Sequence, residues 1–334
     1  MDGIFNLNKP TGMTSHDVVA RVRRLTRQRR VGHAGTLDPA ASGVLPICLG
    51  QATRVVEYLS ESGKCYRATV VLGIVTNTYD AEGEVLRRAP VQVSRKELME
   101  ALPVFLGRQM QLPPRYSAIK VAGQPMYKLA RAGVEVPLQP RPIEISRLDV
   151  IDWQPPALTL EVECSKGTYI RSLAYDLGER LGCGGHLGGL VRLRSGPFTL
   201  DESLTLEELA EALADGTWTN LLYAPDEALL DRLAVIVGPA TERRILMGQD
   251  LLYPPPTTLY SSFLPAQESP PDAVAVEDQS EDTVGMDEDA ENNPAVLPLL
   301  RAYSTDGRFL AILRWHAATN AWHPHKVLAV APLE

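Results

Sequence analysis

The stretch from residue 254 to residue 298 limits most strongly what this chain can fold into. It holds ten Asp or Glu residues, eight prolines and no Lys or Arg. Such a segment buries too little apolar surface to offset the ordering of its backbone, which costs roughly 1–2 kcal/mol per residue. We therefore expect a disordered surface insertion there, and a folded structure built from the residues before and after it.

The same stretch dominates the net charge. The chain carries −8 at pH 7, but the remainder carries +2 once the ten acidic residues of the stretch are left out. The first seventy residues hold ten Lys or Arg against five Asp or Glu, and six of these arginines fall between Arg21 and Arg30. A local basic face sets the attraction for phosphate, so the overall charge does not exclude a nucleic-acid partner.

Composition and termini predict a cytoplasmic protein. No apolar run approaches the ~20 residues that a membrane span needs. The first ten residues lack the basic start and apolar core of a secretory signal. No C-x-x-C pair occurs, so we expect reduced thiols rather than a zinc site or disulfides. The four cysteines are Cys48, Cys65, Cys164 and Cys183.

Before residue 230, strand and helix patterns mix without a regular βαβ alternation, which favours an α+β domain. The expected strands are residues 4–8, 44–49, 64–72, 145–152 and 158–164. The expected helices are a segment that Ser15 can cap, a segment after Ser94, residues 170–181 and a segment after Thr205. Ser94 with Glu97 and Thr205 with Glu208 form capping boxes.

After residue 230 the pattern becomes that of a small β-rich module. Strands are expected at 233–237, 299–303, 309–315 and 327–330, and the middle two form a hairpin around residues 305–308. We place the domain boundary between residues 230 and 231. The second domain, residues 231–334, then encloses the acidic stretch.

Three short segments carry residues suited to chemistry. Residues 31–39 form an expected loop of small residues, which allows close backbone approach and carries the carboxylate of Asp38 near its end. Tyr66 could stack on a base, and Arg171 is expected in the first turn of a helix, where a cation needs an anionic partner. Each also has an ordinary explanation: a turn cap for Asp38, a core position for Tyr66 and a surface ion pair for Arg171.

Together, these segments resemble the TruB family of tRNA pseudouridine synthases, which act on uridine 55 in the T arm. The run GHAGTLDP at residues 32–39 is similar to the family's catalytic motif. The other blocks follow in order: KPTGMTS at 9–15, K-x-Y-x-A at 64–68, T-x-T-x-D-x-E-G at 76–83, PPRYSAIK at 113–120, KGTYIRSL at 166–173, and a last block made of His186-Leu187, Arg192 and GPF at 196–198. The similarity spans about residues 3–198. One departure is Val191, which stands where a basic residue is usual.

The resemblance implies a fold as well. Residues 1–230 would form the pseudouridine synthase catalytic domain, with a mixed and mostly antiparallel sheet. The tail after residue 230 resembles a bacterial PUA-type RNA-binding module. It resembles the short stand-alone type, which implies a monomer with no obligatory protein partner.

The resemblance also implies a mechanism without a cofactor or metal, because nothing is oxidised and no group leaves. Asp38 would be the nucleophile or base, and the choice between C1′, C6 and a sugar proton as its target stays open. The target nucleotide must be flipped out of the T arm. Tyr66 would stack on the flipped base and help to remove the C5 proton. Arg171 would pair with Asp38 and keep it ionised and oriented.

The remaining implied residues contact the substrate. His33 would press on the RNA and hold the flipped arrangement, and Asp80 would be a second partner on the Arg171 side. The basic face and the C-terminal module would bind the tRNA backbone by charge. The other expected contacts are Lys9, Tyr169, Arg21 and Arg24.

Three other functions are open to a chain with these features. A glycoside hydrolase also places carboxylates at an anomeric carbon, but it normally needs two around one bond, and the motif here offers one. A non-catalytic RNA chaperone would use the same basic face to refold tRNA, and that role can coexist with catalysis. A guide-RNA-dependent relative would share the Asp38 block, but the short tail weakens that interpretation.

Overall fold

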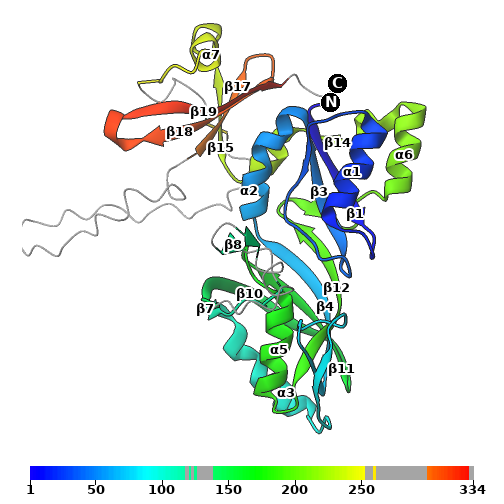
Figure 1. The fold of residues 1–334 in the computed structure, drawn as a ribbon. Coiled ribbons are helices and arrows are strands. Elements are labelled where there is room, and N and C mark those ends of the chain that lie inside the picture. The colour runs from blue at the N-terminus through cyan, green and yellow to red at the C-terminus, as the bar shows by residue number, and fades with distance from the viewer. Residues whose placement is uncertain (117–119, 122–123, 126–137, 253–258, 261–298, 331–334) are drawn as a thin grey trace, which may run out of the picture. The chain divides into compact units, whose positions relative to one another are not determined.

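The computed structural model describes residues 1–116, 120–121, 124–125, 138–252, 259–260 and 299–330 (Figure 1). Backbone contacts divide the chain into two units, Met1–Tyr223 and Ala224–Glu334. The boundary expected after residue 230 therefore lies inside the second unit. The two units are described separately.

A ten-stranded sheet forms the centre of the first unit. Its strands are β1 (Gly3–Lys9), β2 (Val31–His33), β3 (Ser42–Leu49), β4 (Lys64–Leu72), β7 (Gly107–Gln111), β10 (Arg141–Gln154), β11 (Ala157–Cys164), β12 (Gly185–Ser195), β13 (Phe198–Thr199) and β14 (Leu222–Tyr223). The order is β14-β1-β3-β12-β4-β11-β10-β7, with β2 on β3 and β13 on β12. The β3–β12 pair is parallel and the other strand pairs of this sheet are antiparallel. The expected mixed, mostly antiparallel sheet is confirmed.

The described part of this unit also contains two short hairpins, five α-helices and three 3-10 helices, the last at Gly50–Val55, Leu102–Phe105 and Thr217–Leu221. The hairpins are β5 (Ile74–Thr76) with β6 (Val85–Arg88) and β8 (Lys120–Val121) with β9 (Gln124–Pro125). The helices are α1 (Ser15–Thr26), α2 (Val56–Glu61), α3 (Arg95–Ala101), α5 (Ile170–Arg180) and α6 (Leu206–Asp215). The capping boxes expected at α3 and α6 are both present.

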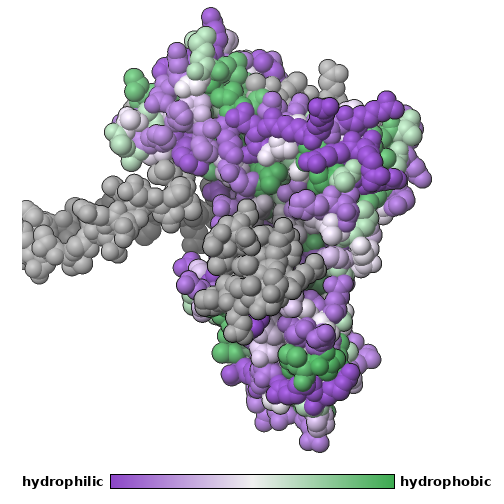
Figure 2. Space-filling model, viewed as in Figure 1, coloured by the Kyte–Doolittle hydropathy of each residue, from purple (hydrophilic) through white to green (hydrophobic). Residues whose placement is uncertain are grey.

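The helix α1 begins one residue away from the cap that its sequence suggested. Thr14, not Ser15, is the N-cap: its backbone is extended and its side chain accepts a hydrogen bond from the Asp17 backbone N–H. Asp17 bonds back to Thr14, so this pair satisfies the helix end and leaves the Ser15 hydroxyl available for another contact. Val18, Val19 and Val22 turn inward, and Figure 2 shows a mostly hydrophilic surface over this helix.

The apolar core of the first unit has two parts. One packs α3 and α5 against the sheet through residues such as Leu98, Leu160 and Leu177. The other packs α1 and α6 against β1 and β3 through residues such as Phe5 and Leu209. All four cysteines are unpaired and buried, as expected.

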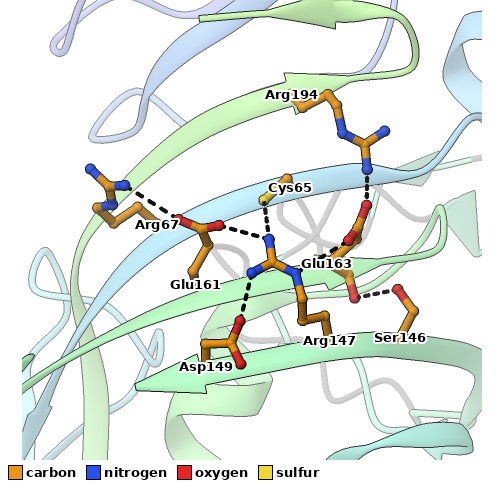
Figure 3. Close-up of polar contacts among 8 residues, drawn as sticks. All are labelled: Cys65, Arg67, Ser146, Arg147, Asp149, Glu161, Glu163 and Arg194. Atoms are coloured by element: carbon orange, nitrogen blue, oxygen red, sulfur yellow. Dashed lines mark hydrogen bonds and ion pairs between the residues drawn. The ribbon is translucent and has the colours of Figure 1, made fainter. Parts of the chain in front are cut away.

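Charged side chains cover one face of the sheet where β4, β10, β11 and β12 lie side by side (Figure 3). Arg147 on β10 lies 2.7 Å from Glu161, 3.4 Å from Glu163 and 2.5 Å from Asp149. Arg67 pairs with Glu161 at 3.3 Å, and Arg194 pairs with Glu163. Three arginines and three carboxylates therefore neutralise one another. Neighbouring residues of a strand point to opposite faces, so Tyr66 faces the other side of the sheet from Arg67.

The second unit is a five-stranded sheet with one described α-helix. Its order is β16-β15-β17-β18-β19, and only the β15–β17 pair is parallel. The elements are β15 (Leu233–Val237), α7 (Pro239–Leu246), β16 (Leu259–Tyr260), β17 (Leu299–Ser304), β18 (Phe309–His316) and β19 (Ala321–Val330). The expected β17–β18 hairpin is confirmed. The helix α7 was not expected from the sequence, and of its eight residues only Ile245 is buried.

Most of the acidic stretch, residues 254–298, lies outside the described residues. The prediction that this stretch is disordered therefore also falls outside them. Two of its residues are described, and they form β16. Tyr260 pairs with Ala234 and Leu259 with Val235, so the sheet takes in a short piece of the stretch that was expected to lie outside it. No helix of the described chain has both the length and the apolar character needed to cross a membrane.

Candidate active site

A cavity of about 750 Å³ opens in the first unit. Residues from distant parts of the sequence meet there, on the face of the sheet opposite the charged network. Five of the residues expected at the site line it: Asp38, Tyr66, Asp80, Tyr169 and Arg171. Lys9, His33, Arg21 and Arg24 are not among the lining residues.

The loop that carries Asp38 is held from both sides. Residues 31–33, expected as part of the loop, instead form β2, because they pair with β3 in the sheet. Beyond them the Ala34 N–H donates to the Pro46 carbonyl at 3.0 Å. The Leu37 N–H donates to the Ser15 hydroxyl at 2.9 Å, and that hydroxyl donates to the Leu37 carbonyl at 3.2 Å. The loop therefore has little freedom next to Asp38, whose side chain remains 47% exposed.

Arg171 joins two carboxylates at the floor of the cavity. Its Nη2 lies 3.1 Å from Asp38 Oδ2, and its Nη1 lies 3.3 Å from Asp80 Oδ2. Arg171 is 8% exposed and stands in the first turn of α5, where the helix dipole disfavours a cation. The two carboxylates compensate for this position. Asp80 is fixed in turn by the Thr78 hydroxyl, which donates to its Oδ1 at 2.5 Å.

Tyr66 lies on β4 with 8% of its surface exposed. Burial raises the pKa of its phenol, and the positive charge and hydrogen bond of Arg192 oppose that rise. A phenol with a raised pKa stays protonated at neutral pH. This favours stacking on a base over proton removal, the other role expected for Tyr66.

Two buried cations of the cavity wall received no role from the sequence. Lys64 is 6% exposed, and its ammonium donates to the carbonyls of Ser60 at 2.7 Å and Ser62 at 2.5 Å. Burial lowers the pKa of Lys64 to about 8. Arg192 is fully buried on β12. Lys64 stands two residues before Tyr66 on one strand, so strand periodicity could have placed it on the same face. Nothing in the sequence marked Arg192 as buried.

Lys9 occupies a different place from the one expected. It is fully buried, and its ammonium donates to the carbonyls of Pro10 at 2.8 Å, Met13 at 2.7 Å and Pro39 at 3.3 Å. Burial lowers its pKa. Lys9 therefore holds the backbone that follows Asp38 and does not reach the cavity or the surface.

His33 stands at the end of β2 beside a second histidine. Its ring lies edge-on to that of His16, with centroids 5.3 Å apart. Its Nδ1 is buried and has no hydrogen-bond partner among the described residues. Burial lowers the pKa of His33 to about 4, which makes it neutral at physiological pH. His16, which the sequence did not single out, is exposed and lines the cavity.

The backbone of Tyr169 is held by one amide side chain. Gln111 accepts from its N–H at 2.8 Å and donates to its carbonyl at 3.0 Å, which fixes the chain just before α5. On α1, Arg21 and Arg24 are exposed, and Arg24 donates only a long 3.4 Å bond to a backbone carbonyl within its own helix. In the described part of the chain, no cluster of three His, Cys, Asp or Glu residues could hold a metal ion.

Comparison with protein families gives two matches that adjoin each other. Residues 23–170 match the TruB family pseudouridylate synthase N-terminal domain. Residues 171–233 match the tRNA pseudouridylate synthase B C-terminal domain. Together they cover residues 23–233, which include most of the residues that line the cavity, whereas Thr14, Ser15 and His16 lie before the first match.

Curated relatives agree with these matches. A tRNA pseudouridine synthase B of Heliobacterium modesticaldum is 48% identical over 242 residues, which are 71% of this chain and 78% of that protein. One of Geobacter sulfurreducens is 48% identical over 230 residues, 69% of this chain and 76% of that protein. One of Gloeobacter violaceus is 48% identical over 254 residues, 75% of this chain and 86% of that protein.

Solved structures share the fold at lower identity. A chain from a Cbf5-Nop10-Gar1 complex superposes with a TM-score of 0.71 at 24% identity, covering 98% of this chain and 85% of that one. A chain from an H/ACA RNP bound to a substrate RNA that contains 2′-deoxyuridine gives 0.69 at 23% identity, covering 99% and 86%. These likenesses concern the fold, and they agree with the α+β class expected from the sequence.

Proposed function

This chain belongs to the TruB family of tRNA pseudouridine synthases, and on that premise we propose that its cavity acts on uridine 55 in the T arm of tRNA. The formation of pseudouridine in tRNA, and hence the enzyme class, follows from the family. The position within tRNA and the residue roles below are our proposals. The GHAGTLDP run at residues 32–39 supports the T-arm target through its likeness to the family motif.

The observation that carries the proposal is the Asp38–Arg171 ion pair at 3.1 Å inside the cavity. The reaction breaks the C1′–N1 bond of uridine, turns the uracil and joins C1′ to C5. It therefore needs a carboxylate that can act as nucleophile or base. The Asp38 side chain is half exposed, so its carboxylate can contact the substrate. The Arg171 side chain is buried, so its guanidinium binds the carboxylate from the protein side.

Asp80 completes this arrangement. Nη2 of Arg171 contacts Asp38 and also donates to the Tyr116 carbonyl at 3.1 Å. The contact to Asp80 at 3.3 Å holds the other arm of the fork, and Thr78 and the Glu82 N–H hold Asp80. We assign Asp80 the role of orienting Arg171, which leaves part of the Asp38 carboxylate open to the substrate.

The other cavity residues fit the recognition of a flipped nucleotide. The Tyr66 ring would stack on the uracil, and Tyr169 would contact the nucleotide from the start of α5. His33 would meet the RNA as a neutral ring at the end of β2. His16, which is exposed and lines the cavity, would meet the RNA beside it. Lys9 would act from within the protein, by holding the chain after Asp38.

The wider surface would hold the rest of the tRNA. Arg21 and Arg24 would contact phosphates, and the C-terminal unit would add an RNA-binding module. Its resemblance to the stand-alone type supports a monomer without an obligatory protein partner. We place the enzyme in the cytoplasm, together with its tRNA substrate.

The test is Asp38→Asn with unmodified tRNA transcript as the substrate. The amide is nearly isosteric but is neither nucleophile nor base, so product should vanish while tRNA binding stays. Carbodiimide-dependent primer-extension stops would map the pseudouridine, and Asp149→Asn, on the charged face of the sheet, is the matched control. Turnover of Asp38→Asn within tenfold of wild type would rule out its assigned role.

A second substrate tests the position. A transcript with cytidine at position 55 should give no product, and pseudouridine at any other position would contradict the T-arm assignment. The chaperone alternative predicts a different result: tRNA refolding by the wild-type protein with no pseudouridine formed at all.

A further inference from the structure

Arg192 is the largest fully buried side chain of the described residues, although it carries a permanent charge. It lies in the cavity wall, yet no carboxylate of the described chain forms an ion pair with it. Burial lowers the pKa values of two nearby cations, Lys9 and Lys64, and the charge of Arg192 lowers them further. A buried cation without an anionic partner is costly for folding, so its presence calls for another explanation.

The position of Arg192 in the sheet links the two parts of the catalytic site. On one side it pairs with Gly43 of β3, the strand that follows the Asp38 loop. On the other side it pairs with Tyr66 of β4. Gly43 allows this closeness: a Cβ there would lie 2.3 Å from the Arg192 carbonyl oxygen, and its φ is +105°. The strand of Arg192 therefore sets the spacing between loop and tyrosine.

The side chain of Arg192 makes the same link through its hydrogen bonds. Nε donates to the Val44 carbonyl at 2.7 Å, and Nη2 donates to the Gly35 carbonyl at 2.8 Å, within the Asp38 loop. The positive charge of the guanidinium also acts on the Tyr66 phenol and opposes the rise in its pKa. A planar fork with several donors in fixed directions can serve both carbonyl acceptors at once, which a lysine ammonium on a flexible stem cannot match.

Gly35 shows how closely the loop rests on this group. Its φ is +79°, and a Cβ at this residue would lie 3.4 Å from Arg192 Nη1. The loop backbone thus lies directly on the guanidinium, three residues before Asp38. If Arg192 were displaced, the loop and the Tyr66 ring would lose their shared support, and each could shift relative to the other.

We infer that Arg192 is a positioning residue for the isomerisation, and that it fixes the distance between the Asp38 loop and the Tyr66 ring. The inference rests on the proposed function of Asp38 and Tyr66. Arg192 makes no ion pair with the Asp38 carboxylate and acts through the Gly35 carbonyl and through its strand pairing with Tyr66. Its loss should therefore slow the chemical step and leave the binding of tRNA, which depends on the outer surface, largely intact.

The experiment compares Arg192→Lys with Arg194→Lys, a matched change on the same strand at the charged face. Single-turnover rates are measured with enzyme in excess over tRNA, so that the maximal rate and the half-saturating concentration are obtained separately. Arg192→Lys should lower the maximal rate at least thirtyfold and change half-saturation less than threefold. Arg194→Lys should stay within twofold of wild type in both.

Two further measurements keep the inference falsifiable. Circular dichroism and thermal unfolding establish that each variant is folded, and Arg192→Gln replaces Arg192→Lys if the lysine variant is not. In a Tyr66→Phe background, Arg192→Lys should cost less than in wild type, because the phenol on which the guanidinium charge acts is gone. Three results would overturn the inference. The first is a folded Arg192 variant whose maximal rate lies within threefold of wild type, and the second is an effect confined to the half-saturating concentration. The third is a double variant whose loss of rate equals the sum of the two single losses in free energy. An active Asp38→Asn protein would instead refute the proposed function.

Discussion

Ser15 offers a direct test of whether the rigidity of the Asp38 loop matters for catalysis. Its hydroxyl is 1% exposed and accepts the Leu37 N–H at 2.9 Å while donating to the Leu37 carbonyl at 3.2 Å. Leu37 is itself 3% exposed. Ser15→Ala therefore leaves a buried N–H with no acceptor, immediately before Asp38.

The size of the effect follows from these contacts. An unsatisfied buried donor costs about 1–3 kcal/mol. Alanine returns roughly 0.5 kcal/mol as the better helix former at the first position of α1. The free energy of unfolding should fall by about 0.5–2.5 kcal/mol, which for a domain of this size lowers the melting temperature by roughly 1–10 °C. Because a displacement of ~1 Å in a catalytic group can cost about a hundredfold in rate, we expect at least a tenfold slower single-turnover reaction.

Ser94→Ala provides a control matched in chemistry and stability. Ser94 caps α3 and accepts the Glu97 N–H at 3.2 Å, away from the cavity, so its loss should cost about 1 kcal/mol with no change in rate. Urea unfolding and single-turnover assays on both variants separate the two effects. A Ser15→Ala protein that is destabilised but reacts at the wild-type rate would refute the link between loop anchoring and catalysis. A loss below ~0.5 kcal/mol would refute the energetic reasoning itself.

Two other predictions concern charge. Burial holds the pKa of His33 at about 4 in the folded protein. Between pH 6.5 and pH 4 the unfolded chain therefore takes up a proton that the folded protein does not, and the free energy of unfolding falls as the pH drops through this window. His33→Asn should lessen that fall, as measured by urea unfolding at pH 6.5 and pH 5, and an unchanged pH dependence would mean that His33 is not held neutral. Replacing Arg21, Arg24 and Arg27 together with Ala should weaken tRNA binding. The slope of the logarithm of the binding constant against the logarithm of the salt concentration should become shallower by roughly 0.9 for each duplex phosphate that is no longer neutralised. An unchanged slope would show that tRNA docks elsewhere.

The sequence predicted those parts of the fold that depend on local pattern. Strand β4 and the caps of α3 and α6 follow from alternation and from short-range hydrogen bonds, which neighbouring residues determine. The same holds for the β17–β18 hairpin. The resemblance to the family predicted that Asp38, Tyr66 and Arg171 belong to one site, and all three line the cavity.

Burial of polar residues could not be predicted in this way. The resemblance implied that Lys9 contacts the pocket or the RNA, but it donates to three backbone carbonyls and is fully buried, which is unusual for a lysine. Arg192 lies within a strand pattern that gives no sign of its burial, because its acceptors come from β3 and from the loop before it, far away in the chain. Ser15 was expected to cap α1, since a serine before an apolar periodic run fits that role as well as Thr14 does. Tertiary contacts decide the places of Lys9 and Arg192, whereas the local capping box of Thr14 with Asp17 decides where α1 begins.

The neutral network of arginines and carboxylates on the other face of the sheet has a consequence for how tRNA arrives. Long-range electrostatic forces guide a charged molecule during diffusion, and they depend on the net charge of each face rather than on its number of ionic groups. Because Arg67, Arg147 and Arg194 are each matched by a carboxylate, this face exerts little pull on a polyanion at distances beyond a Debye length. Collisions there would be brief and unguided, whereas the exposed arginines of α1 would capture tRNA from further away. The balanced face thus makes a productive first encounter more frequent without adding a single contact to the bound complex.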